Sequence, residues 1–200
     1  MLLLALICGD VSVPVFMGWS ADGTKVCLVQ IGVHDGSGFP FAWIEVLGPT
    51  GTDRYFYEYN CYEEEMNDSA LVFRAREVAS RLGVVGDNKG VQLSVRPADS
   101  LELSEEGVTV RNYGCGAGSA SVEERHTGMD ENELWPVGGV VVYWNRKQVF
   151  SSDVGEEGFS WWLQDAYIRQ GKLALVLGRH EPGFEGPNSR FTLVVTDISQ

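Results

Sequence analysis

The sequence predicts a mainly β protein, either an antiparallel β-sandwich or a partial propeller-like sheet, with one amphipathic α-helix at about residues 68–82. Three observations lead to this fold class. Short runs of β-branched and aromatic residues recur along the chain, turn signals separate them at close spacing, and a helical apolar pattern occurs once. A complete propeller is not expected, because the helix interrupts the spacing of about 40 residues that four-stranded blades require.

Composition indicates one acidic globular domain. The chain has 200 residues, of which 44% are hydrophobic, an ordinary fraction for a protein with a packed core. It carries 28 acidic against 15 basic side chains, a formal net charge of −13. Such a surface repels phosphate groups, so nucleic acid is not an expected partner and anionic membrane surfaces are disfavoured. We expect a single domain over residues 9–200.

Residues 1–8, MLLLALIC, are continuously apolar, and polar sequence begins at Gly9. The run is too short to span a bilayer, so no integral membrane segment is expected. It is typical of a truncated signal peptide without its positive n-region, which predicts a start further upstream and a periplasmic or secreted protein. Two alternatives stay open. One is a buried N-terminal strand, and the other is lipoprotein anchoring through Cys8, although Ile7 occupies a position that usually holds a small residue.

The first strands follow from local signals. Residues 11–17 are apolar and β-branched, and Pro14 within them indicates an edge strand or an extended lead-in. Residues 21–23, Ala-Asp-Gly, form a turn signal, and residues 25–31 are then apolar on both faces, as in a buried strand. Further strands are expected at residues 41–47 and 55–59.

A helical pattern occupies residues 68–82. The cluster Asn67, Asp68 and Ser69 supplies an N-cap, and Gly83 supplies a stop. Arginines lie on one side of this segment, and apolar residues lie on the other at helical spacing, namely Leu71, Ala75, Val78 and Leu82. We expect this helix to cover a face or an edge of a sheet.

The second half of the chain contains only short β runs. Gln170 and Gly171 predict a tight hairpin turn, and the polar residues 125–133 predict a solvated loop. The expected strands are residues 91–95, 108–113, 119–123, 139–144, 149–150, 161–168, 172–177 and 191–196.

Two hairpins, one near each end of the chain, share a plan. Each has a strand, a loop in which glycine precedes a histidine–acid pair and a Gly-Phe pair, and a return strand. The pairs are His34 with Asp35 and His180 with Glu181. If the hairpins pack side by side, two imidazoles and two carboxylates converge, a set that suits a divalent metal such as zinc. The alternative is chance similarity between two exposed loops on unrelated edges.

Catalytic and cysteine signatures are weak. Residues 158–162, GFSWW, lack the second glycine of a nucleophile elbow, and a hydrolase stays an alternative only because a triad is recognised by geometry. The cysteines match no zinc motif. Export would permit one disulfide, for which Cys61 with Cys115 is the expected pair because Cys27 lies in a buried strand. Buried or free thiols without a function are nevertheless the favoured interpretation of the cysteines.

Aromatic residues favour a binding module. The chain has six tryptophans and seven tyrosines, including the pair Trp161 and Trp162. Adjacent strand positions point to opposite faces, so at least one of these two rings can be exposed. Exposed aromatic rows recognise glycans or protein partners, whereas buried rings would be ordinary core residues.

Three stretches carry a family resemblance: residues 9–23, which include GWSADG, the helix that ends near Leu82, and residues 182–190, PGFEGPNSR. In these the chain resembles a family of predicted secreted bacterial proteins classed as a domain of unknown function. The Asp-Gly turn is also similar to blade hairpins of periplasmic propeller proteins, in which a proline stands where this chain has Ala21. The resemblance implies export and a place in the cell envelope, and it brings no catalytic residues or cofactor. We therefore expect an exported binding module that is not an enzyme, with an unknown protein or glycan ligand.

Overall fold

The computed structural model describes residues 9–34, 38–48, 54–60, 68–84, 88–103, 107–129, 136–152, 159–183 and 187–198. These residues form thirteen strands and one helix. The elements are β1 (Val11–Trp19), β2 (Val26–Val33), β3 (Pro40–Leu47), β4 (Arg54–Asn60), α1 (Asp68–Arg81), β5 (Val91–Leu93), β6 (Arg96–Leu103), β7 (Val108–Gly114), β8 (Ser119–Met129), β9 (Pro136–Trp144), β10 (Lys147–Ser152), β11 (Phe159–Arg169), β12 (Lys172–Glu181) and β13 (Asn188–Asp197).

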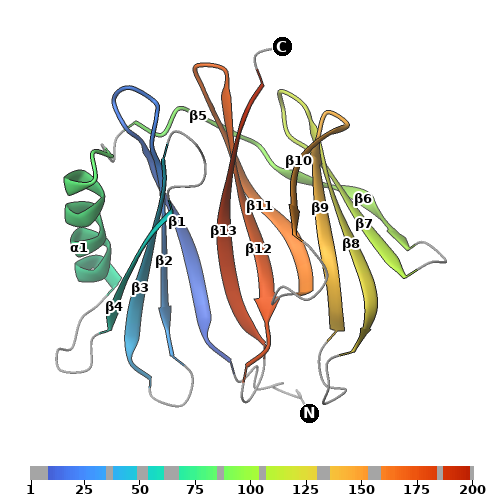
Figure 1. Ribbon diagram of the computed structural model, residues 1–200, viewed down its shortest axis with the longest axis horizontal. Helices are drawn as coiled ribbons and strands as arrows, with labels where there is room; N and C mark the ends of the chain where they lie inside the picture. The colour runs from blue at the N-terminus through green and yellow to red at the C-terminus, as the bar shows by residue number, and fades with distance from the viewer. Residues whose placement is uncertain are drawn as a thin grey trace.

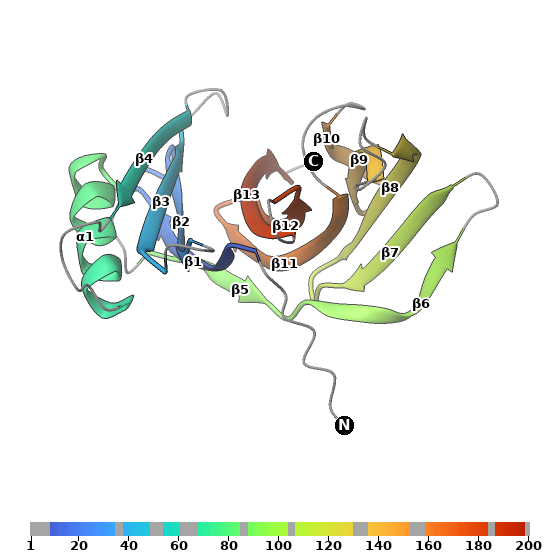
Figure 2. The same cartoon turned by 90° about the horizontal axis from the view of Figure 1, so that it is seen from below.

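The strands form three antiparallel sheets, in which chain neighbours pair as meanders. The first sheet has the order β1-β2-β3-β4, the middle sheet β13-β12-β11-β5, and the third sheet β10-β9-β8-β7-β6. Helix α1 flanks the first sheet, and the three sheets stand beside one another (Figure 1). Seen from below, β11 curves around β12 and β13 (Figure 2). The mainly β, antiparallel fold class with one helix is therefore confirmed, with three stacked sheets.

Apolar side chains hold these layers together. In β12, Leu173, Leu175 and Leu177 pack in the core between the middle and third sheets, whereas Ala174 and Val176 pack toward the first sheet. All five side chains are buried. Because both faces of β12 are covered, its sequence is apolar without alternation.

The first sheet is covered on both faces in the same way. Val29 and Cys27 pack against Leu71 and Ala75 of α1, and Leu28 packs toward the middle sheet. Burial raises the pKa of the Cys27 thiol to about 12, and the nearby Glu45 adds to this rise. The predicted helix at about residues 68–82 and its role as a sheet cover are confirmed.

Several local predictions are also confirmed. Strand β1, which contains Pro14, lies at the edge of its sheet. The turn between β11 and β12 has positive φ at both Gln170 (50°) and Gly171 (77°), as a two-residue hairpin turn of the type I′ class requires. The turn between β9 and β10 has the same pattern at Asn145 (48°) and Arg146 (69°), so two meanders close through equivalent turns.

Two sequence expectations are wrong. Strand β6 was not expected, because Arg96–Leu103 contains Pro97 and charged residues. It forms at the edge of the third sheet. Proline is tolerated there because an edge strand has a neighbouring strand on one side only, so the backbone hydrogen bond that proline cannot donate is not required on the other. The polar loop expected at residues 125–133 is part of strand β8 as far as Met129. These residues have no apolar pattern, but their backbone pairs with that of β9. Residues 130–133 lie outside the described part of the chain.

The open edge of β13 faces side chains of the first sheet. Gln30 donates from Nε2 to the carbonyl of Phe191 (2.6 Å) and accepts from the Phe191 amide (2.8 Å). The Leu193 amide donates to Oε2 of Glu45 (3.2 Å). Gln30 and Glu45 are both buried and take the place of a neighbouring strand, which satisfies backbone groups that an edge strand otherwise leaves unpaired.

The turn before β2 is held by one carboxylate. Oδ1 of Asp22 accepts hydrogen bonds from the Ser20 hydroxyl (2.5 Å), the Thr24 amide (3.0 Å) and the Thr24 hydroxyl (2.8 Å). These bonds, that from Ser20 first, lower the pKa of Asp22 from 3.8 to about 2. This local geometry is the Asx-type turn that the sequence predicts.

Asp22 gives a pH-dependence prediction. Its folded-state pKa is depressed, so its stabilising contribution is complete above about pH 4 and is lost as the pH falls through about 2. We expect wild type to unfold at a higher urea concentration than Asp22→Asn at pH 5. This difference should shrink as the pH is lowered from 4 to 2. A difference that stays constant over this range would contradict the assignment.

Candidate functional site

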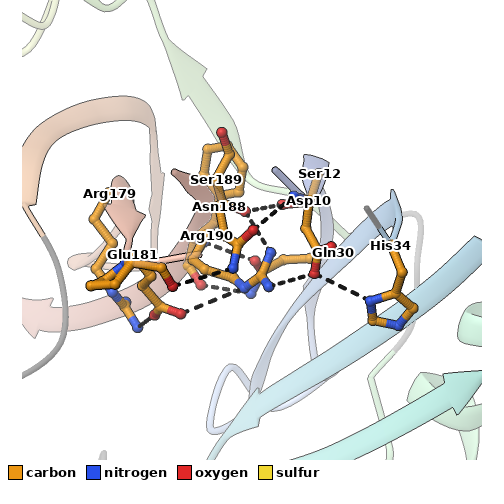
Figure 3. A network of polar contacts seen from close by, with 11 residues as sticks. Asp10, Ser12, Gln30, His34, Arg179, Glu181, Asn188, Ser189 and Arg190 are labelled. Carbon is orange, nitrogen blue, oxygen red and sulfur yellow. Dashed lines mark hydrogen bonds and ion pairs between the residues drawn. The ribbon is translucent and has the colours of Figure 1, made fainter. Parts of the chain in front are cut away.

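One end of the sheets gathers the polar and aromatic side chains most suited to binding. His34 follows β2, His180 lies near the end of β12, and His126 lies in the second half of β8. Strand pairing brings His180 opposite Phe159 and Ser189, and His126 opposite Gly138, at this same end. We call this region the sheet-end site. It comprises the polar network around Asp10, His34, Arg179, Glu181 and Arg190, which Figure 3 shows, and the rings of Trp162 and His180.

Asp10 is the centre of the first half of the sheet-end site. Its Oδ2 lies 3.2 Å from Nδ1 of His34 and accepts a hydrogen bond from Nη2 of Arg190 at 2.8 Å (Figure 3). The Asp10 amide donates to the Asn188 side chain, and the Asp10 carbonyl accepts from the Ser189 amide. Asp10 thereby fastens the chain ahead of β1 to β13 of the middle sheet.

Arg190 connects this half to a second carboxylate. Its Nε lies 3.6 Å from Oε2 of Glu181, and Glu181 also forms an ion pair with Arg179. The Arg190 side chain is 6% exposed, while those of Asp10 and Glu181 are 14% and 18% exposed. A buried guanidinium thus lies between two carboxylates that water reaches only slightly. Its positive charge is compensated within the site.

Aromatic rings of the first sheet complete the surroundings of Arg190. The guanidinium carbon lies 4.4 Å from the ring centroid of Trp43 and 5.8 Å from that of Phe41. The imidazole of His34 stacks on Phe41 with centroids 4.4 Å apart. These contacts place Arg190 against ring faces, where a cation is attracted by the π electrons.

A second aromatic group lies on the middle sheet. The His180 ring is 5.1 Å from Trp162 and 5.8 Å from Phe159, and Trp162 meets Phe191 edge-on. Burial lowers the pKa of His180 below its usual 6.5, and the charge of Glu124 partly opposes this. His180 is therefore neutral at pH 7 and offers one hydrogen-bond donor and one acceptor.

Trp162 owes its position to a glycine. A Cβ on Gly178 would lie 2.2 Å from the Trp162 ring, so only glycine lets the indole cross β12 at this point. The ring is half-buried, and its Nε1 donates to Gln164. The two adjacent tryptophans do point to opposite faces, but neither ring is exposed, because Trp161 is buried in the core with the third sheet and Trp162 packs half-buried on the other side.

Among the described residues, the structure does not bring the predicted metal ligands together in one cluster. His34 and Glu181 join one network, but through Asp10 and the positively charged Arg190. His180 contacts rings of the middle sheet, and Asp35 lies outside the described residues. Among the side chains that the structure describes, no three His, Cys, Asp or Glu residues are grouped to hold a metal ion.

The metal hypothesis keeps a direct test. If His34, Asp35, His180 and Glu181 bind a cation, Zn²⁺ or Ni²⁺ will raise the melting temperature of the wild type but not of the variant His34→Ala/His180→Ala. The Arg190 guanidinium opposes a nearby cation, so a wild type without any shift is the result that the described geometry favours.

A buried carboxylate near the third sheet was missed from the sequence. Glu124 accepts hydrogen bonds from Nη1 of Arg111 (3.0 Å) and from the Ser160 amide, and its Oε1 lies 3.8 Å from Nε2 of His126. Ser160 has φ of 52° in a bulge of β11. The serine of the weak elbow pattern therefore donates from its backbone amide to Glu124, which holds β11 against β8.

The described cysteines are free thiols. Cys27 and Cys115 are both buried, and neither is in a disulfide. The expected pairing of Cys61 with Cys115 is therefore wrong, because Cys115 is enclosed in the core between the middle and third sheets. Cys61 and Cys8 lie outside the described residues.

Comparison of the chain with protein-family models, with curated proteins and with solved structures finds no match. The resemblance to a secreted family stays an expectation from sequence. Within the described residues, no helix is both long enough and apolar enough to cross a membrane.

Proposed function

We propose that this protein is a non-catalytic binding module of the cell envelope and that the sheet-end site binds a glycan. The observation that carries this proposal is the pair of half-buried rings near the end of β12, Trp162 and His180, whose centroids lie 5.1 Å apart. Export rests on the apolar residues 1–8 and on the family resemblance.

The chemistry of the sheet-end site suits a sugar. A sugar ring has an apolar face that stacks on an indole and hydroxyls that bond to charged or polar groups at its rim. The neutral His180, whose ring lies 5.1 Å from Trp162, offers a donor and an acceptor beside the indole. The positive charges of Arg179 and Arg190 balance the negative charges of Asp10 and Glu181, which favours a ligand without a strong charge.

A fluorescence titration tests the glycan. Tryptophan emission is followed while chitotetraose or cellotetraose is added to the wild type, to Trp162→Leu and to His180→Gln. We expect saturable quenching in the wild type and an affinity lower by about tenfold or more in both variants. His180→Gln keeps a polar side chain but removes the ring beside Trp162, and it guards against a folding defect in Trp162→Leu.

The matched control is Tyr143→Leu. Tyr143 lies on β9, two residues before Asn145 and at the opposite end of the strand from Gly138, which pairs with His126, and it is also partly exposed. Its variant should bind as the wild type does. No saturable binding of either oligosaccharide by the wild type at millimolar concentration would overturn the glycan assignment.

A further inference from the structure

The outward face of α1 differs in character from the rest of the surface. Phe73 is 62% exposed, although the helix turns other apolar residues, such as Leu71 and Ala75, into the core with the first sheet. Arg76 and Arg81 are exposed as well, and the Arg74 side chain is 56% exposed. The fold needs none of these four side chains for packing.

The charge of this face is opposite to that of the molecule. Three arginines against Asp68 and Glu77 give the helix a formal charge of +1, so the remaining residues carry −14. Arg74 interacts with Glu77 across 3.3 Å at the surface, a pair that contributes little in water. The flanking guanidiniums of Arg76 and Arg81 have no ion pair among the described residues.

Helical spacing places the exposed arginines of α1 around Phe73. With 100° per residue, Phe73 points away from the side that holds Leu71, Ala75 and Ala79, and Arg76 and Arg81 lie on either side of it. Figure 1 shows α1 at the flank of the molecule, with the first sheet on its other side. An exposed aromatic ring between arginines has the composition of an interaction hot spot.

We propose that the outward face of α1 docks an acidic segment of a partner protein that places an apolar side chain on Phe73. Charge complementarity selects this occupant, because an acidic segment is attracted by Arg74, Arg76 and Arg81. An anionic membrane is disfavoured, because the remaining charge of −14 opposes approach and the apolar side of the helix is already buried in the fold.

Fluorescence anisotropy tests this surface. The probe is a fluorescein-labelled octapeptide of six glutamates and two leucines, measured at low and physiological salt. We expect wild type to bind it, more weakly as salt rises. Phe73→Ser and the triple variant Arg74→Gln/Arg76→Gln/Arg81→Gln should each lose about tenfold or more in affinity. An octapeptide with serine for leucine should lose its dependence on Phe73.

The matched control removes basic charge elsewhere. Arg146→Gln/Lys147→Gln changes two exposed residues at the turn between β9 and β10 and should bind the probe as the wild type does. Failure of the wild type to bind at low salt, or equal losses in control and helix variants, would overturn the proposal. So would sedimentation with phosphatidylglycerol vesicles without peptide binding, or a dimer that Phe73→Ser dissociates.

Discussion

Replacing Arg190 by Met is expected to destabilise the protein by about 3 kcal/mol, at the lower end of the range for breaking a buried ion pair. The reason is that Asp10 and Glu181, whose side chains are only 14% and 18% exposed, would lose their shared cation while staying poorly hydrated. The change would also remove the guanidinium from the rings of Trp43 and Phe41. Urea unfolding followed by circular dichroism measures the loss.

The comparison variant for this prediction is Arg74→Met. It breaks the pair with Glu77, in which the side chains are 56% and 38% exposed, and it should cost less than about 0.5 kcal/mol. If Arg190→Met and Arg74→Met destabilise the protein equally, the network at the sheet-end site does not hold the first and middle sheets together.

The second large effect is expected at Gln30. Gln30→Leu replaces the amide by an apolar side chain one atom shorter, which cannot bond to the amide and carbonyl of Phe191. Two unsatisfied backbone groups should cost about 2–4 kcal/mol in the free energy of unfolding. Chemical denaturation measures this loss. Hydrogen exchange at the Phe191 amide should also become faster than in the wild type.

A matched glutamine is available nearby. Gln164 is exposed and bonds to Nε1 of Trp162, so Gln164→Leu should leave stability nearly unchanged. A wild-type rate of exchange at Phe191 in Gln30→Leu would mean that Gln30 does not serve as the partner of the β13 edge.

Periodicity and turn chemistry were enough to predict most of the fold. The doubly apolar run at residues 25–31 indicated a strand covered on both sides, and it lies between helix and middle sheet. The hairpin turn at Gln170 followed from its residue types. Strand β6 could not be predicted, because its pairing with β7 depends on a neighbour and its own sequence has no period.

The site was only partly predictable. The structure links His34 to Glu181 only through Asp10 and Arg190, which are 180 positions apart in the sequence and meet through sheet stacking. The sequence did contain a signal for the side chains that cover the edge of β13. Gln30 and Glu45 are single polar residues inside otherwise apolar strands, and such positions in a core need hydrogen-bond partners.

The most direct test of the glycan proposal is a map of backbone amide NMR shifts in ¹⁵N-labelled protein titrated with chitotetraose or cellotetraose. We expect the shifts to concentrate at Trp162, Gly178 and His180, in the part of the sheet-end site that the middle sheet forms, and the amides around Asn145 to stay unchanged. Shifts centred on Asn145 or on α1, or no saturable shifts with either sugar, would contradict it.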